Sequence, residues 1–96
     1  MEILKQQEGE KLTITLKGRL DTTTAPELEK ELALAGVKEL VFEIAGLDYV
    51  SSAGLRLFLS AHKTMLKQGE MTIAGAVPVV REVFDITGFS DILNLV

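Results

Sequence analysis

Apolar and β-branched polar residues alternate near the start of the chain in the pattern of a strand with one buried face. Residues 12–16 read Leu-Thr-Ile-Thr-Leu, and the three apolar side chains of such a strand lie together on the core side. Residues 1–7 predict a shorter strand before it. The polar, Gly-containing segment 7–10 separates the two, so we expect them to form a hairpin.

The pattern then changes to helical spacing. Thr24 and Glu27 fit a capping box, and Pro26 fits the first turn of a helix that Gly36 is expected to end. The buried stripe of this predicted helix consists of Leu28, Leu32 and Ala35.

A second pair of strand and helix follows in the middle of the chain. Residues 38–44 predict a strand, and because its apolar run is nearly continuous we expect a central strand that is covered on both faces. We interpret residues 45–47 as a loop or bend. From residue 52 to residue 67 apolar residues recur every three or four positions, which indicates an amphipathic helix.

The C-terminal third predicts one further strand and a third helix. Residues 71–74 predict the strand, and Pro78 fits the first turn of a helix that Gly88 ends. The residues of this helix expected to pack inward are Val79, Val80, Val83 and Phe84. For residues 90–96 we expect a helical turn followed by a brief strand.

The predicted order of elements is ββαβαβα, which defines the fold class. It indicates a single α/β domain over residues 1–96, with a mixed four- to five-stranded sheet and helices packed on it. The sheet is expected to begin with the hairpin and to continue through right-handed crossovers.

Composition and charge exclude several classes of protein. The ten basic and fourteen acidic residues give a net charge of −4, which argues against a nucleic-acid partner. The chain has no apolar run long enough for a membrane span, and no signal-peptide pattern at its start. It has no cysteine, so disulfides, thiolate metal sites and thiol nucleophiles are ruled out. Together these features favour a cytoplasmic protein that does not bind membranes.

Two adjacent serines, Ser51 and Ser52, stand where the chain passes from the strand region into the helix of residues 52–67. The first N–H groups of a helix have no partner within it, and that end carries partial positive charge. A serine there either caps the helix through its side-chain oxygen or offers an exposed hydroxyl for phosphorylation. Both interpretations stay open for both serines.

Asp21 and Asp48 each end a predicted strand, so they flank the serines if those strands are neighbours. One interpretation makes them a turn residue and a loop residue. The other makes them a polar rim that orients a hydroxyl or binds the Mg²⁺ of a nucleotide.

No complete catalytic apparatus is recognisable. His62 stands about 15 Å along the helix axis from Ser52, too far for the hydrogen bond of about 3 Å that a Ser–His pair needs. We interpret it as a histidine at the edge of the core. Gly-x-x-x-x-Gly-Lys-Ser/Thr, Gly-x-Gly-x-x-Gly and Gly-x-Ser-x-Gly do not occur. We therefore expect no catalytic residue, no metal site and no cofactor, and a protein that others bind or modify rather than an enzyme.

Three motifs carry a resemblance that spans nearly the whole chain. They are residues 18–21, Gly-Arg-Leu-Asp, residues 42–55, Phe-Glu-Ile-Ala-Gly-Leu-Asp-Tyr-Val-Ser-Ser-Ala-Gly-Leu, and residues 83–89, Val-Phe-Asp-Ile-Thr-Gly-Phe. The middle motif is the specific one. With them the chain resembles the bacterial anti-sigma factor antagonists (anti-anti-sigma factors), the single-domain members of the STAS group.

The resemblance implies a switch between binding partners. The unphosphorylated antagonist binds an anti-sigma factor that is also a serine kinase, and the sigma factor is released to act in transcription. The kinase phosphorylates the antagonist with ATP and Mg²⁺, the complex separates, and a phosphoserine phosphatase restores the hydroxyl. The family carries the phosphate two residues before the motif glycine, which corresponds to Ser52 here, and it implies a monomer.

The motif departs from the commonest form in one way. Many phosphorylated members carry Asp-Ser-Ser-Gly or Asp-Ser-Thr-Gly, whereas residues 51–54 read Ser-Ser-Ala-Gly. Ser51 replaces the aspartate and stays an alternative phosphate acceptor.

The expected contact surface lies around the start of the serine helix. Gly54 is there either because a partner backbone approaches it or because the turn itself requires it, and Arg56 is either an interface charge or a solvating residue. The partner-binding residues we expect are Asp21, Thr22, Thr23, Thr24, Asp48, Ser51, Gly54, Leu55 and Arg56.

Two other functions remain as alternatives. The first is a STAS-type scaffold or sensor module that binds a nucleotide or a small anion at the Ser52 helix N-terminus. The second is a small hydrolase that uses Ser52 with Asp21 or Asp48, which is disfavoured because no base lies within reach of the serine.

Overall fold

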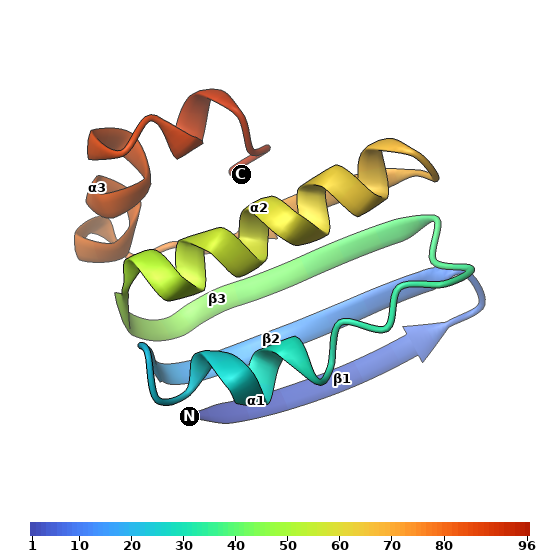
Figure 1. Cartoon of the computed structure of the whole chain (residues 1–96), viewed down its shortest axis with the longest axis horizontal. Helices are drawn as coiled ribbons and strands as arrows, with labels where there is room; N and C mark the ends of the chain where they lie inside the picture. The colour runs from blue at the N-terminus through green and yellow to red at the C-terminus, as the bar shows by residue number, and fades with distance from the viewer.

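A computed structural model describes all residues of the chain, 1–96. Its elements follow one another in the predicted order ββαβαβα (Figure 1). They are β1 (Glu2–Glu8), β2 (Lys11–Leu20), α1 (Ala25–Glu29), β3 (Glu39–Val50), α2 (Ser52–Leu66), β4 (Glu70–Ala74), α3 (Pro78–Ile86) and a short 3₁₀ helix η1 (Phe89–Asp91).

The four strands form one mixed sheet in the order β1-β2-β3-β4. β1 and β2 pair antiparallel as a hairpin, and β3 and β4 extend the sheet in parallel. After η1, Leu95 pairs with Ile73 of β4 in a single parallel bridge, so the C-terminal segment contacts the sheet edge without forming a fifth strand. The predicted fold class and the C-terminal helical turn are confirmed, whereas the expected brief strand is reduced to this bridge.

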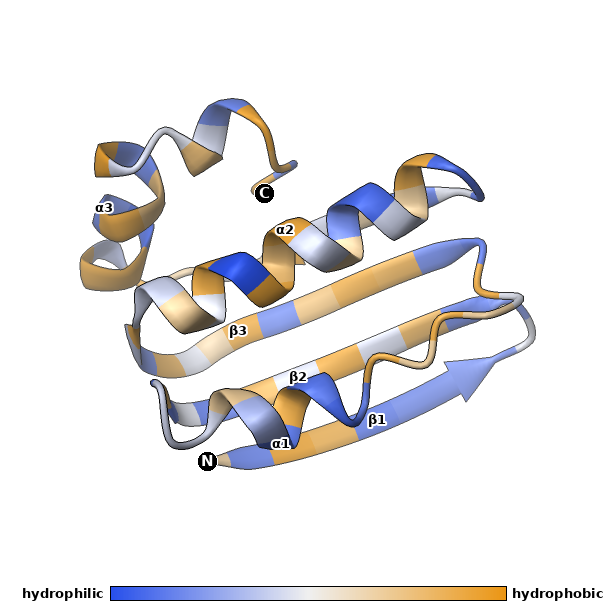
Figure 2. Cartoon of the chain, viewed as in Figure 1, coloured by the Kyte–Doolittle hydropathy of each residue, from blue (hydrophilic) through white to orange (hydrophobic).

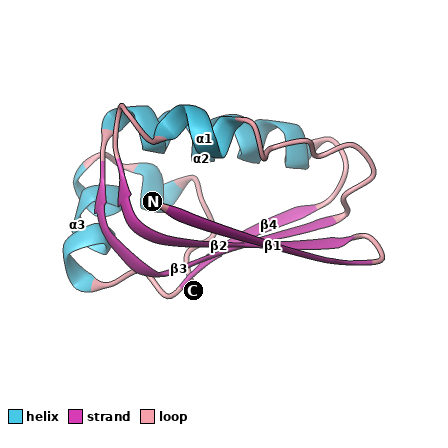
Figure 3. Ribbon diagram, turned by 90° about the horizontal axis from the view of Figure 1, so that it is seen from below, coloured by secondary structure: helices cyan, strands magenta, loops and turns pink.

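The helices α1 and α2 lie over the same face of the sheet (Figure 3). Both belong to crossovers between parallel neighbours that advance in one direction, β2 to β3 to β4, and the right-handed rule then places both on one side. The strand residues buried under them are Leu12, Ile14, Leu16, Leu40, Phe42, Ile44, Met71 and Ile73. The apolar bands along β2 and β3 follow this alternation (Figure 2).

Three phenylalanines join the layers of the core. Phe58 of α2 meets Phe42 of β3 edge-on, with ring centroids 4.9 Å apart, and lies 5.8 Å from Phe84 of α3. No polar or charged side chain is buried in this core.

The prediction that β3 is covered on both faces is wrong. Val41 is half-buried and Glu43 is exposed on the face opposite α1 and α2. The reason is the one-directional order of the parallel strands, which leaves no crossover helix for that face.

Residues 45–47 were expected to form a bend, but they belong to β3, which continues to Val50. The pairing of β2 with β3 shifts register twice, between Thr15 and Lys17 and between Gly18 and Arg19. Each shift places an extra residue on β3, so bulges curve the strand without ending it.

The helix predicted to end near Gly36 is much shorter, because α1 ends at Glu29. Ala35 is exposed and Leu32 half-buried, whereas Leu34 and Val37 are buried. The side-chain amide of Gln68, just beyond α2, donates hydrogen bonds to the backbone oxygens of Leu34 (2.5 Å) and Val37 (2.8 Å). These carbonyls thus have partners outside a helix, which the local pattern could not reveal.

α3 forms as predicted, with one difference in its buried face. It packs through Val80 and Phe84, one turn apart, while Val83 is half-buried. Val79 was expected inside but is 59% exposed, because it lies beside this stripe and not on it.

Candidate functional site

The start of α2 rests on the carboxyl end of β2. The backbone N–H of Ser51 donates to the carbonyl of Leu20 at 2.8 Å. A Cβ placed on Gly54 would lie 2.6 Å from Cγ of Leu20 and 3.3 Å from its carbonyl oxygen. The packing of α2 on β2 is therefore sufficient to explain Gly54, without a partner backbone that approaches it. A side chain here would push α2 away from β2.

The two serines have different roles in the structure. Ser51 is the N-cap of α2, with extended backbone, and its half-buried side-chain oxygen accepts a hydrogen bond from the N–H of Gly54 at 3.4 Å. Ser52 is the first residue of the helix and is exposed. Its hydroxyl has one contact, from Nη2 of Arg56 at 3.5 Å, which is long for a hydrogen bond, as is the 3.4 Å cap bond of Ser51. The two serines therefore differ in position and exposure: Ser51 is the half-buried cap, and Ser52 presents an exposed hydroxyl.

The loop before α1 is organised by Asp21. Its Oδ1 accepts from the N–H of Thr23 (2.9 Å), the hydroxyl of Thr23 (2.7 Å) and the N–H of Thr24 (3.1 Å). The predicted capping box of Thr24 and Glu27 is wrong, since Thr24 makes no side-chain cap bond. Its hydroxyl donates to the carbonyl of Arg19 at 2.8 Å instead. Asp21, which stands where the chain turns out of β2, accepts hydrogen bonds from the N–H groups of Thr23 and Thr24 in the loop before α1.

These hydrogen bonds lower the pKa of Asp21 from 3.8 to about 2, the Thr23 hydroxyl contributing most and the N–H of Thr24 next. A carboxylate whose pKa is lowered by folding stabilises the folded state at pH values above 3.8, and the stabilisation is lost as the pH falls toward 2. We expect Asp21→Asn to lower the free energy of unfolding at neutral pH. Urea unfolding of both proteins between pH 7 and pH 2 should show this gap closing below about pH 4. A gap of constant size down to pH 2 would contradict the assignment.

Arg19 and Tyr49 form a contact that the sequence did not predict. The Arg19 guanidinium lies 4.2 Å from the centroid of the Tyr49 ring, and its Nε is 3.7 Å from Oδ2 of Asp21. The two residues are register partners on β2 and β3. No local sequence pattern indicates this contact, because the two residues become neighbours only through the register that the bulges set. Tyr49 is 40% exposed, so this pair adds an aromatic surface beside the Asp21 loop.

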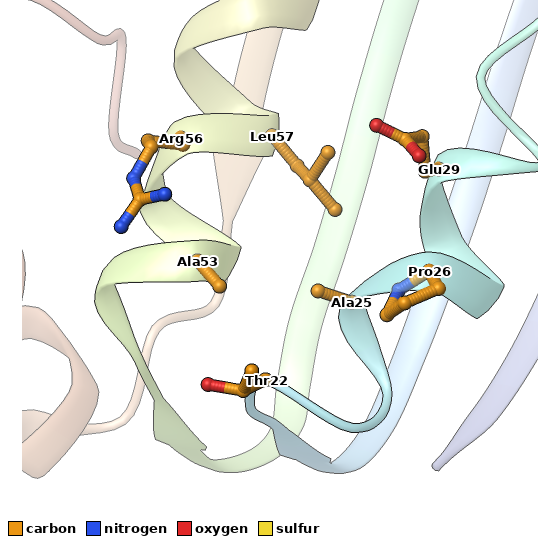
Figure 4. A pocket seen from close by; sticks show the side chains of 7 residues that line it. All are labelled: Thr22, Ala25, Pro26, Glu29, Ala53, Arg56 and Leu57. Carbon is orange, nitrogen blue, oxygen red and sulfur yellow. The ribbon is translucent and has the colours of Figure 1, made fainter.

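A cleft of about 310 Å³ opens between α1 and α2 (Figure 4). Arg56, the residue that contacts the Ser52 hydroxyl, forms part of its wall. Sequence reasoning had singled out Thr22 and Arg56, but no local pattern indicates that α1 meets α2 in this way. The lining residues are Thr22, Ala25, Pro26, Glu29, Ala53, Arg56 and Leu57.

Three residues considered at the sequence level lie outside this arrangement. Asp48 is exposed within β3, inside the second bulge and not at the strand end, and its carboxylate has no hydrogen bond or ion pair. Leu55 is 4% exposed and belongs to the core, so its side chain presents no contact surface. His62 is half-buried farther along α2, as expected for a histidine at the core edge.

The structure contains neither a metal-ligand cluster nor a membrane-spanning helix. No three His, Asp or Glu side chains gather in a way that would hold a metal ion. None of the helices combines the length and apolarity that crossing a membrane requires.

Comparison with known families settles the membership. The family model of the STAS domain matches residues 2–96. The chain belongs to the STAS domain family. This confirms the resemblance carried by the three motifs, and the similar proteins bear the expected name.

Two relatives illustrate this. The STAS chain is 41% identical over 85 residues to the "putative anti-sigma factor antagonist BtrV" of Bordetella bronchiseptica, covering 84% of this chain and 73% of that protein. It is 30% identical over 96 residues to the anti-sigma-B factor antagonist of Listeria monocytogenes, covering 96% and 84%.

Solved structures share the fold. A crystal structure of an anti-sigma factor antagonist from Mycobacterium paratuberculosis superposes with a TM-score of 0.88 at 20% identity, over 98% of this chain and 83% of that one. The phosphorylated form of SpoIIAA from Bacillus superposes with a TM-score of 0.70 at 18% identity, over 99% and 91%. At these identities the likeness establishes the STAS fold alone.

Proposed function

We propose that this STAS domain is an anti-sigma factor antagonist, which binds an anti-sigma factor and so frees a sigma factor for transcription. The names of its relatives support this, because two of them at 30% identity or more are called anti-sigma factor antagonists. The proposed contact surface consists of the first turn of α2 and the loop of residues 21–24, which lie side by side at the ends of β2 and β3.

The observation that carries the proposal is the difference between the two serines. Ser51 is the half-buried helix cap, whereas the Ser52 hydroxyl is exposed on the first residue of α2. We propose that the partner is also a serine kinase, which transfers the γ-phosphoryl group of ATP to Oγ of Ser52. The bond between the γ-phosphorus and the bridging oxygen breaks, ADP leaves, and the serine proton passes to the kinase. A phosphatase reverses the change by hydrolysis, which returns the hydroxyl and inorganic phosphate.

Electrostatics explains how such a phosphate could act as a switch. It adds a charge of about −1.5 to −2 at the N-terminal end of α2, which the helix tolerates because that end carries partial positive charge. The fold therefore tolerates the phosphate, whereas the same charge opposes any partner that places a carboxylate against this surface. The switch would work in the cytoplasm, where sigma factors act, with the domain as a monomer.

The phosphorylation site is tested by mapping. Incubation with the kinase-type anti-sigma factors of the same genome and ATP should add one phosphate to the wild type, detected by intact mass and assigned to Ser52 by peptide mapping. Ser52→Ala should remove labelling to below about 1% of wild type, because the proposed acceptor oxygen is gone.

Ser51→Ala is the matched control. It should still be labelled, although loss of the cap is expected to cost about 1 kcal/mol of stability. Labelling of Ser52→Ala at the wild-type level, or its loss in a folded Ser51→Ala variant, would assign the phosphate to another residue.

A nucleotide- or anion-binding module is the second candidate. The specific feature in its favour is the cleft between α1 and α2, whose lining includes Arg56 and Thr22. A saturable rise in melting temperature with ATP, GTP or inorganic phosphate, in the absence of any kinase, would favour this function over partner switching.

A further inference from the structure

Arg56 is the one arginine of the chain without a carboxylate partner. Arg19 pairs with Asp21, and Arg81 pairs with Asp85 at 3.3 Å. The only side-chain hydrogen bond of Arg56 is the one that Nη2 donates to the Ser52 hydroxyl at 3.5 Å. A guanidinium at this site thus has an unused capacity to bind an anion.

The first turn of α2 lacks negative charge. Acidic residues are favoured in the first turn of a helix, because that end carries partial positive charge. α2 has no acidic residue in its first turn, and Arg56 is its first charged residue. A phosphate on Ser52, four residues before Arg56, would supply the missing negative charge on the same face of the helix.

We propose that Arg56 is the internal counter-ion of phosphorylated Ser52. The inference rests on the proposed function, since it concerns a phosphate at this serine. It adds a second part to the switch: the phosphate pairs with a cation of the protein's own surface as well as adding a charge at the serine.

The chemistry favours this contact over the one present without phosphate. The phosphate replaces a neutral hydroxyl with a group that bears three terminal oxygens and reaches farther from the helix. Arginine can bind two of these oxygens at once through charge-assisted hydrogen bonds, which are shorter and stronger than a bond to a neutral oxygen. The long 3.5 Å contact becomes a close one.

None of the carboxylates around the site forms an ion pair with Arg56. Glu29 of α1 lines the same cleft but forms no ion pair with Arg56. The Asp21 carboxylate is bound to the threonines and to Arg19, and Asp48 of β3 has no partner. All three carboxylates would raise the pKa of a nearby phosphate, so a lowered phosphate pKa would report on Arg56.

The proposal also has a consequence for the cleft. Arg56 is the only cation in its lining and Glu29 the only anion. Once the guanidinium is paired with the phosphate, its charge is no longer free to attract an acidic side chain of a partner. Phosphorylation would then remove an attractive contact in addition to creating a repulsive one.

The test uses the full chain with phosphoserine installed at position 52 by site-specific incorporation, so that no kinase is needed. The phosphate is titrated by ³¹P NMR, and its second pKa, about 6 for free phosphoserine, is compared between variants. We expect the value in the wild-type background to lie about 0.5 pH unit or more below that of Arg56→Gln, with Arg56→Lys in between.

Lys63→Gln is the matched control, because it removes the same charge from α2 about 10 Å farther along the helix axis than Arg56. It should titrate like the wild type. A second measurement, the Nε–Hε signal of Arg56, should shift on phosphorylation while those of Arg19 and Arg81 stay in place. Equal phosphate pKa values in the wild type and Arg56→Gln would overturn the inference. Since the phosphoserine is installed directly, that result would leave kinase labelling of Ser52 as a separate question.

Discussion

Replacing Ser52 with aspartate is expected to weaken binding to the anti-sigma factor about 30-fold or more, which corresponds to roughly 2 kcal/mol. The new carboxylate stands on the exposed first residue of α2, in the middle of the proposed contact surface. A partner that docks there must bury or face this charge. The domain itself should keep its stability, because a negative charge at this end of a helix is favourable by about 0.3–1 kcal/mol.

Calorimetric titration of the variant with the kinase-type anti-sigma factors of the same genome measures the loss, and thermal unfolding measures stability. Ser60→Asp is the matched control, since Ser60 is also exposed on α2 but lies about 12 Å farther along its axis. It should bind like the wild type. If both variants lost affinity equally, net charge alone would account for the effect, and the first turn of α2 would not be the docking surface.

The outline of the fold could be predicted because it depends on local patterns. The alternation over residues 12–16 and the helical spacing after Ser52 are each satisfied within one element, and the order of elements then restricts the topology. The length of α1 could not be predicted in this way. It depends on Gln68, more than thirty residues away, which binds the carbonyls of Leu34 and Val37 and so stabilises a non-helical path.

The candidate site was predicted in position but not in detail. The strand-to-helix junction identified both serines, yet which one caps α2 depends on the extended backbone of Ser51 and on its distance to the N–H of Gly54. The contact between Arg19 and Tyr49 depends on the register that two bulges set. Asp21 was expected beside the serine, but its carboxylate is used within its own loop. Sequence patterns report residue types and spacing, whereas these roles depend on backbone angles and pairing.

Gly69→Ala is expected to be among the most destabilising single substitutions, at about 3 kcal/mol or more. Gly69 lies in the turn between α2 and β4, where the chain passes close to the start of β3. A Cβ there would overlap the carbonyl of Lys38, at 1.9 Å from its oxygen and 2.6 Å from its carbon. That carbonyl cannot move freely, because it accepts a hydrogen bond from the N–H of Glu70 at 2.9 Å.

The control for this substitution is Gly36→Ala, which separates overlap from backbone strain. Gly36 has a positive φ of 81° but open space around its Cβ position, so alanine there should cost about 1–2 kcal/mol through strain alone. Gly69 has no such φ, so its cost would come from overlap alone. Thermal unfolding followed by circular dichroism should show a melting temperature about 12 °C or more below the wild type for Gly69→Ala. A loss no larger than that of Gly36→Ala would mean that the start of β3 yields to the added methyl group, and that the junction of β3 and β4 is less rigid than its hydrogen bonds indicate.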